Sequence, residues 1–285
     1  MPQDEHAMYR HASGSEANTV ALWKRLLTAV LVFVYFELGY TWAAKGHFAE
    51  ELFFAHTPVD DWIPLIPVFI VFYMLGYLFV FAPVVMFEQT KDYYWGVCLS
   101  IVILSTAFLI FKNFPVYMHK PYATGTDAFS RLTYLTQAGD FQVNNFPSLH
   151  VALNVYCWLL LFLRYGRRML WLIWAPILIV ASTVLVKQHL VLDVIGGLAL
   201  GGVAGLVFWR LHAREGLGRI GYWLALSLTG VVILTNAHRL PRVAAVVGQS
   251  VAEIFERGWL VGAAIIALLL LCAWMLRKTQ AKGEA

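Results

Sequence analysis

The sequence predicts an all-α integral membrane protein, built as a polytopic bundle of transmembrane helices. Hydrophobic residues occupy 60% of the 285 positions, and only 13% of the residues are charged. A soluble domain of this length cannot hide so much apolar surface in a single core. Apolar runs near or above the roughly 18 residues that cross a bilayer recur along the chain, and Pro, Gly or charge clusters separate them. Lipid is therefore the expected solvent of this chain.

About eight of these runs are expected to be transmembrane helices. They cover residues 26–42, 63–87, 94–111, 149–163, 169–186, 190–209, 220–235 and 259–276. The polar residues 1–21 carry both signs of charge, which favours a cytoplasmic tail over a cleavable signal peptide. Residues 277–285 are expected to form a second cytoplasmic tail.

Positive charge in the loops is expected to orient the bundle. A cytoplasmic N-terminus places most of the 21 Lys and Arg residues on the inner side, as the positive-inside bias requires. Arg164, Arg167 and Arg168 share a very short loop, which makes them the strongest anchor. The net charge of +4 is spread over these loops, so it describes orientation and gives no case for a nucleic-acid partner.

One long polar stretch lies between the apolar runs and covers residues 112–146. Long irregular segments of this kind are a common place for function. Residues 126–137 open with a helix cap at Thr126 or Asp127 and then place their apolar side chains on one side. This pattern predicts a short helix that lies in the membrane interface.

A histidine follows the polar stretch, at the start of the fourth apolar run. Pro147 suits the first turn of a helix, and the free backbone N–H groups of such a turn form an anion site. Ser148 adds a hydroxyl donor, and His150 adds a titratable ring. A Pro-Ser pair before a helix is more often only a cap, so this feature alone is weak evidence for a site.

His189 and Asp193 follow the fifth apolar run, four residues apart. On a helix they would share a face, where the carboxylate holds the imidazole in one tautomer and stabilises its cation. A nucleophilic imidazole needs such a partner. The alternative is a pair that merely bond each other near the interface. Titratable residues are costly at a membrane span, which favours the functional interpretation.

The polar residues singled out above are expected to meet on the outer side of the membrane. They are Lys120, Ser148, His150, His189 and Asp193. No set of Cys and His has zinc spacing, and no carboxylate cluster resembles a magnesium site, so the chemistry is expected to need no metal and no cofactor. The single cysteines lie inside apolar runs, where they are expected to be core residues without a disulfide framework.

At these residues the chain resembles the type-2 phosphatidic acid phosphatase superfamily. The pattern of that family is a Lys and an Arg-Pro pair, then Pro-Ser-x-His, then Ser-Arg, five residues, His, three residues and Asp. Residues 120–121 read Lys-Pro in place of Arg-Pro, residues 146–150 fill the second motif, and residues 182–193 keep the spacing of the third. Thr183 replaces the third-motif Arg, and Leu149 replaces the common Gly. These changes resemble the branch that contains inositol phosphorylceramide synthases and related bacterial proteins.

The resemblance implies a six-helix catalytic core over residues 22–212, followed by an additional transmembrane hairpin over residues 213–276. It implies that His189 attacks phosphorus and becomes a phosphohistidine, and that Asp193 orients its ring. His150 would protonate the departing alkoxide and then activate the acceptor. The implied phosphate ligands are Lys120, Ser148 and Lys187.

Lys187 is expected to supply the cation that the third motif has lost. It lies four residues after Thr183, which stands in place of the family's arginine. One helical turn separates such positions, so the ammonium is expected at nearly the same phosphate oxygens.

Two further features lie inside apolar runs. Gly197, Gly201 and Gly205 recur every four residues, which predicts a close helix contact in the core. Glu37 lies within the first run, where a packing role and a role on the path of the substrate both stay open.

The expected substrate is a phosphorylated lipid, processed on the periplasmic or equivalent outer face of a bacterial inner membrane. The leading hypothesis is a lipid phosphatase. The second is a lipid head-group phosphotransferase, of the sphingolipid synthase kind, that passes the same phosphohistidine to a lipid alcohol. The third is a non-catalytic lipid carrier or scaffold. The His189 and Asp193 pair argues against the third, because carriage needs no orienting carboxylate.

Overall fold

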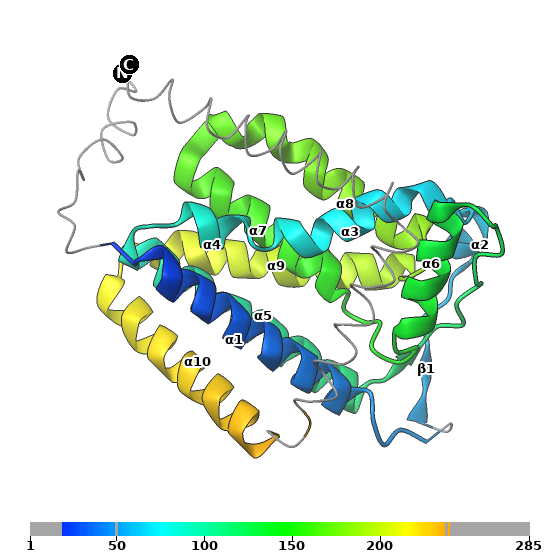
Figure 1. The fold of residues 1–285 in the computed structure, drawn as a ribbon, viewed down its shortest axis with the longest axis horizontal. Helices are drawn as coiled ribbons and strands as arrows, with labels where there is room; N and C mark the ends of the chain where they lie inside the picture. Colours follow the sequence, from blue (N-terminus) through cyan, green and yellow to red (C-terminus); the bar gives the residue numbers. More distant parts are fainter. Residues whose placement is uncertain (1–18, 49–50, 237–238, 240–285) are drawn as a thin grey trace.

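The computed structural model of the protein describes residues 19–48, 51–236 and 239. Its α-helices are α1 (Leu22–Ala43), α2 (Pro58–Trp62), α3 (Ile70–Phe79), α4 (Ala82–Met86), α5 (Thr90–Asn113), α6 (Ala128–Gly139), α7 (Leu149–Tyr165), α8 (Trp174–Leu185), α9 (Val191–Leu211) and α10 (Glu215–Thr235). The 3-10 helices η4 (Pro67–Phe69) and η5 (Gly166–Ile173) and the strands β1 (Phe53–Phe54) and β2 (Val116–Tyr117) complete the set. The long helices lie against one another, and α2, α6 and β1 gather at one end (Figure 1). The predicted all-α bundle is confirmed.

Six helical stretches in the described part of the chain are long and apolar enough to cross a membrane. The longest, Leu149–Leu185, contains α7 and α8 with η5 between them. Helix α7 ends at Gly166, whose φ of 68° only glycine adopts easily, and α8 packs back on α7. This stretch therefore holds the fourth and fifth predicted spans as a hairpin. The chain is a multi-pass integral membrane protein.

Helix α10 lies on the outside of the bundle, against α1 and α5 (Figure 1). The Thr28 and Tyr222 hydroxyls are 3.1 Å apart, and Trp95 Nε1 donates to the Arg214 carbonyl over 3.2 Å. Helix α10 matches the seventh predicted span. The eighth, residues 259–276, is the second arm of the predicted hairpin over 213–276 and lies outside the described residues.

The second predicted span, residues 63–87, begins later and is less regular than the sequence indicated. The backbone is extended at Ile63 and Ile66, and the helix starts only at Pro67. Proline disfavours a helical residue before it, so Pro64 and Pro67 together delay the start. A second break separates α3 from α4, which restarts with Pro83 in its first turn, where a missing N–H costs nothing.

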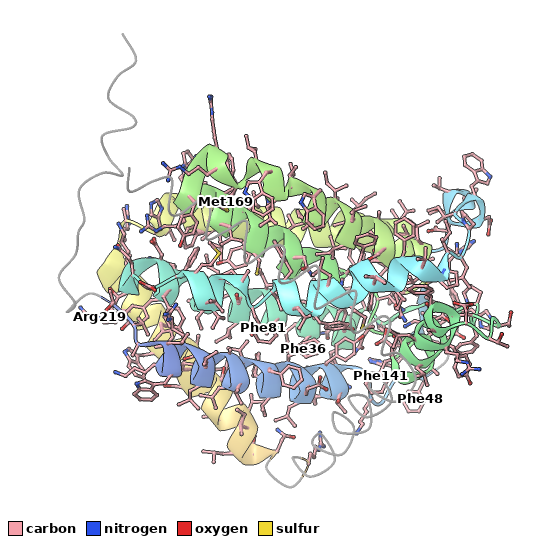
Figure 2. All side chains as sticks on the ribbon, turned by 45° about the horizontal axis from the view of Figure 1, so that its top comes forward. Phe36, Phe48, Phe81, Phe141, Met169 and Arg219 are labelled. Atoms are coloured by element: carbon pink, nitrogen blue, oxygen red, sulfur yellow. The ribbon has the colours of Figure 1, made fainter. Side chains whose placement is uncertain are left out.

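Basic side chains concentrate at the end of the bundle that lies away from α6. Figure 2 shows Met169 and Arg219 toward this end and Phe48 and Phe141 toward the other. The helix termini and turns at the basic end carry Lys24, Arg25, Lys91, Arg164, Arg167, Arg168, Arg210, Arg214 and Arg219. The two ends of the bundle therefore differ in their density of positive charge.

Helices α7 and α9 approach each other closely enough for backbone to meet backbone. A Cβ at Gly197 would lie 2.6 Å from the Ser148 carbonyl oxygen, and one at Gly201 would overlap the Ala152 carbonyl. A Cβ at Gly205 would lie 2.6 Å from Cδ1 of the Leu159 side chain. The predicted close contact through these glycines is confirmed, because only hydrogen side chains let the two backbones approach so far.

Candidate functional site

The second motif forms the start of α7. Ser148 is the N-cap residue, and its Oγ accepts a hydrogen bond from Val151 N at 3.3 Å. Its own N–H donates to the Asp193 carbonyl at 3.0 Å, and its side chain is fully buried. Ser148 therefore caps α7, as a Pro-Ser pair before a helix often does. Its N–H also joins the second motif directly to the third.

The third motif is a turn between two helices. Helix α8 ends at Leu185 and α9 begins at Val191, so His189 lies on neither helix. The two residues therefore do not share a helix face, but they still lie close together: His189 Nδ1 is 3.6 Å from Asp193 Oδ2. Asp193 comes close because it is the third residue of α9, and its Oδ2 folds back to accept the Leu190 N–H at 2.8 Å.

The two ring nitrogens of His189 have different surroundings. Nδ1 is buried and faces Asp193, at a separation longer than a hydrogen bond. Nε2 is not among the buried unpaired atoms. The ring keeps 7% of its surface exposed, whereas the Asp193 side chain keeps none. Asp193 therefore lies on the Nδ1 side of the ring, and Nε2 lies on the opposite side.

His150 projects from the first turn of α7 into a group of aromatic side chains from α3. Its ring stacks on Tyr73 with centroids 4.2 Å apart, and Tyr77 meets it edge-on at 5.0 Å. Nε2 is buried and has no hydrogen-bond partner among the described residues. The ring lies within electrostatic range of His189 and Asp140. The segments that carry the two histidines also meet, since the Ser148 N–H donates to the Asp193 carbonyl and so joins the start of α7 to the start of α9.

Gly76 makes room for His150. A Cβ at this position would overlap Nε2 of the ring and lie 2.7 Å from Cε1 and 3.0 Å from Ile179. We expect Gly76→Ala to push the imidazole off Tyr73 and to lower turnover by roughly 10²-fold. Turnover of a phosphorylated lipid and far-UV circular dichroism together measure the effect and the retained fold.

The matched control for Gly76 is Gly230→Ala in α10, where an added Cβ meets nothing within 4 Å. It is expected to leave turnover unchanged. If Gly76→Ala folds and works as well as this control, the position of the His150 ring does not matter for the reaction.

Lys120 is fully buried at the centre of a hydrogen-bond network. Its Nζ donates to Asp140 Oδ2 and, at 2.7 Å, to Gln188 Oε1. The other oxygen of Asp140 accepts from the Tyr40 hydroxyl at 2.6 Å. A buried ammonium needs such partners, because its desolvation is costly. Since Gln188 precedes His189, this network extends from α1 to the turn that carries His189.

The sequence interpretation missed Asp140, Gln188 and Tyr40. The position of Gln188 next to His189 was a usable signal, and so was the isolated carboxylate of Asp140 after the interfacial helix. Tyr40 carried no signal of its own, because it lies in an apolar run that contains other aromatic residues.

Lys187 is not one helical turn from Thr183, as the sequence suggested. Helix α8 ends before it, and its φ of 51° is left-handed. Its Nζ donates to the Asp60 carbonyl at 2.8 Å. Thr183 is buried, and its hydroxyl donates to the Val180 carbonyl. The two side chains therefore bond to different segments of the chain, although Lys187 lies only two residues before His189.

Asp60 in α2 is a further residue that the sequence interpretation did not assign to the site. Its Oδ1 accepts the Val191 N–H at 2.8 Å, and its Oδ2 accepts from Thr57 N and Oγ1 at 2.8 and 2.6 Å. Burial alone would raise the pKa of Asp60, but these hydrogen bonds and nearby His56 outweigh it and hold the pKa below its ordinary value of 3.8. Asp60 is thus an anion throughout the neutral range.

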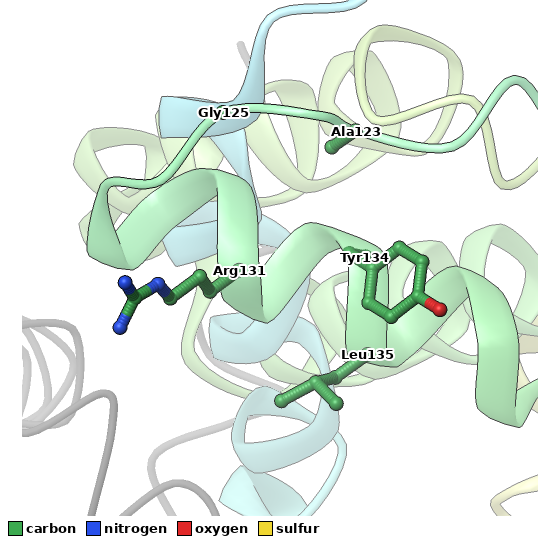
Figure 3. Close-up of a pocket in the computed structure, with 5 residues that line it drawn as sticks. All are labelled: Ala123, Gly125, Arg131, Tyr134 and Leu135. Atoms are coloured by element: carbon green, nitrogen blue, oxygen red, sulfur yellow. The ribbon is translucent and has the colours of Figure 1, made fainter.

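The interfacial helix predicted for residues 126–137 is α6, and Asp127 is its cap, accepting from Phe129 N and Ser130 N. A hollow of about 240 Å³ lies between α6 and the preceding loop (Figure 3). Its lining is Ala123, Gly125, Arg131, Tyr134 and Leu135. The hollow adjoins the loop that contains Lys120, because Ala123 and Gly125 of that loop line it. Neither His150 nor His189 lines it, so it is separate from the polar cluster. Among the described residues, no group of His, Cys, Asp and Glu is placed to hold a metal ion.

Comparison with known proteins adds a family to this geometry. Neither the curated proteins nor the solved structures contain a match to the chain. Residues 45–207, more than half of the chain, match the model of the PAP2 superfamily. The matched range includes every residue of the cluster from Asp60 to Asp193. This multi-pass membrane protein, whose paired histidines meet at one end of a helix bundle, therefore belongs to the PAP2 superfamily.

Proposed function

We propose that the protein is a membrane lipid phosphatase that hydrolyses a lipid phosphate ester through a phosphohistidine on His189, without a metal or cofactor. Membership of the PAP2 superfamily indicates a phosphatase or a phosphotransferase. One observation carries the assignment within this range. His189 has Asp193 at its buried nitrogen, an accessible nitrogen on the opposite side of the ring, and a second histidine within electrostatic range.

In the first step, the lone pair of His189 Nε2 attacks phosphorus. The bond from phosphorus to the lipid oxygen breaks, and His150 gives that oxygen a proton. In the second step, His150 takes a proton from water, and the water oxygen attacks phosphorus. The phosphorus–nitrogen bond then breaks, and inorganic phosphate or a phosphorylated head group leaves. Asp193 stabilises the imidazolium that would form in the first step.

The nonbridging oxygens require donors that are fixed before the substrate arrives. Lys120 uses two of its three N–H donors on Asp140 and Gln188, so one remains for a phosphate oxygen. The Ser148 hydroxyl accepts from Val151 and keeps its own O–H for donation. Lys187, with one donor on Asp60, keeps two more. The N-terminus of α7 adds the positive end of its helix dipole to these phosphate-binding donors.

We place this site at the outer face of the membrane, the periplasmic face if the protein is bacterial. The polar cluster lies at the end that carries α2 and α6 (Figure 1), away from the basic termini and turns. A lipid would present its phosphate at this depth while its chains stay in the bilayer.

A lipid head-group phosphotransferase, as in the inositol phosphorylceramide synthase-like branch, is the second candidate. One observation favours it: His150, which must activate the acceptor, is stacked on Tyr73 and edged by Tyr77. An aromatic, water-poor surrounding disfavours water and suits an acceptor hydroxyl carried by a lipid. The phosphatase remains our first choice, because hydrolysis is the commoner outcome in the superfamily to which the chain belongs.

The two candidates predict different acceptors. Purified protein given phosphatidate, a polyprenyl phosphate or a lipid phosphodiester is expected to release phosphate or a phosphorylated head group into water. Parallel samples would contain ceramide or diacylglycerol, with labelled phosphate followed by thin-layer chromatography. Release that begins only when a lipid alcohol is added, with label on that alcohol, would replace the phosphatase by the transferase. Tight lipid binding without either product would support a carrier.

A further inference from the structure

We propose that Asp60 is a positioning residue that clamps the nucleophile turn, residues 186–190, from both sides. Its carboxylate binds the amide that follows the turn, and its carbonyl binds a side chain within the turn. The consequence for catalysis rests on the proposed function, but the clamp itself is a structural statement that can be tested without any substrate.

The carboxylate of Asp60 fixes the start of α9. Val191 is the first residue of that helix, and its N–H has no acceptor within the helix. Asp60 Oδ1 supplies the acceptor at 2.8 Å, across a separation of 131 residues in sequence. Thr57 N and Oγ1 hold Oδ2, so the carboxylate cannot turn away. An anion at the first turn of a helix also interacts favourably with the helix dipole.

The carbonyl of Asp60 fixes the other part of the turn. Lys187 adopts a left-handed φ of 51°, which is uncommon for a residue with a side chain and needs support from its surroundings. Its Nζ reaches the Asp60 carbonyl at 2.8 Å. The segment before α3 adds a third tie, because Ile66 N donates to the Leu185 carbonyl at 2.8 Å.

His189 lies between the two attachment points, Lys187 and Val191. Inside the turn, Gln188 N and His189 N both donate to the Thr183 carbonyl, at 2.9 and 3.1 Å. The imidazole makes no hydrogen bond of its own within the described residues, and Nδ1 is 3.6 Å from Asp193. The direction of Nε2 therefore depends on the backbone of the turn, which Asp60 binds directly at Val191 and through the side chain of Lys187 at the other end.

Asp61 provides a matched control at the next position in the chain. Its side chain is 67% exposed and bonds only to the exposed His56, at 2.9 Å. Removing this carboxylate tests for general effects of a lost negative charge at α2 without touching the turn.

The experiment compares Asp60→Ala, Asp60→Asn and Asp61→Ala in the purified full-length protein. Amide hydrogen exchange over peptides that cover residues 186–194 is the first readout, since the Val191 N–H should lose its only acceptor in Asp60→Ala. The kcat and KM for a lipid phosphate form the second readout. We expect faster exchange and a kcat that falls by about 10- to 100-fold in Asp60→Ala, with a much smaller change in KM.

The other variants sharpen this result. Asp60→Asn keeps an oxygen acceptor for Val191 and is expected to recover most of the lost kcat and protection, whereas Asp61→Ala should match the parent protein. If Asp60→Ala does not fold, Thr57→Val releases the carboxylate more gently and should show the same changes at smaller size.

Unchanged exchange at Val191 in a folded Asp60→Ala protein would overturn the clamp. Faster exchange with an unchanged kcat would overturn its positioning role. A parent protein inactive on every phosphorylated lipid would instead overturn the proposed function, and the exchange data would still decide whether Asp60 holds the turn.

Discussion

His189→Ala is expected to lower turnover by roughly 10³-fold or more, because it removes the group that accepts the phosphoryl unit. With a labelled substrate, the parent protein should form an acid-labile, base-stable adduct on the protein, and the variant should form none. Rapid quenching followed by gel autoradiography under alkaline conditions measures the adduct. His150→Ala should lower both formation and breakdown, because one residue serves both proton transfers.

The control for His189 is His212, at the opposite end of α9. Its Nδ1 faces the carbonyls of Phe208 and Trp209 and has no contact with the cluster. His212→Ala should keep activity within about twofold of the parent protein, because this half-buried ring lies at the opposite end of α9 from His189. An adduct that persists in His189→Ala would remove the phosphohistidine from the mechanism.

The second large effect is expected in the contact between α7 and α9. A Cβ at Gly201 would overlap the Ala152 carbonyl and lie 3.1 Å from its carbonyl carbon and 3.2 Å from its Cα. The obstacle is backbone, so no side-chain rotation relieves it. Gly201→Ala should therefore destabilise the fold by about 1–3 kcal/mol. It should also reduce turnover by at least about tenfold, since the same contact holds Ser148 and His150 against Asp193.

Gly202 is the matched control for Gly201. It is the next residue in the same helix, and an added Cβ there meets nothing within 4 Å. Gly202→Ala should be neutral or should stabilise the helix by roughly 0.5–1 kcal/mol. Thermal unfolding in detergent and turnover are measured for both variants. Equal tolerance of the two substitutions would show that the helices do not need this approach.

Lipid as the solvent, and most of the helices, could be predicted from residue order alone. Apolar length determines whether a segment can cross a bilayer, and this property is local to each run. The Asp127 cap and the glycine stripe of α9 could be predicted for the same reason, because each depends on residues within a few positions of one another. The candidate histidines could be named because titratable side chains are rare in such a chain.

The surroundings of those histidines were decided only by the tertiary structure. Asp60 meets Val191 across 131 residues, Lys120 meets Gln188 across 68, and Tyr40 meets Asp140 across 100. The sequence placed His189 between two predicted spans, and only the structure shows that it lies in a turn held by Thr183 and Asp60. No local pattern specifies such contacts, because a buried hydrogen-bonding group needs a partner but does not determine which distant segment will supply it.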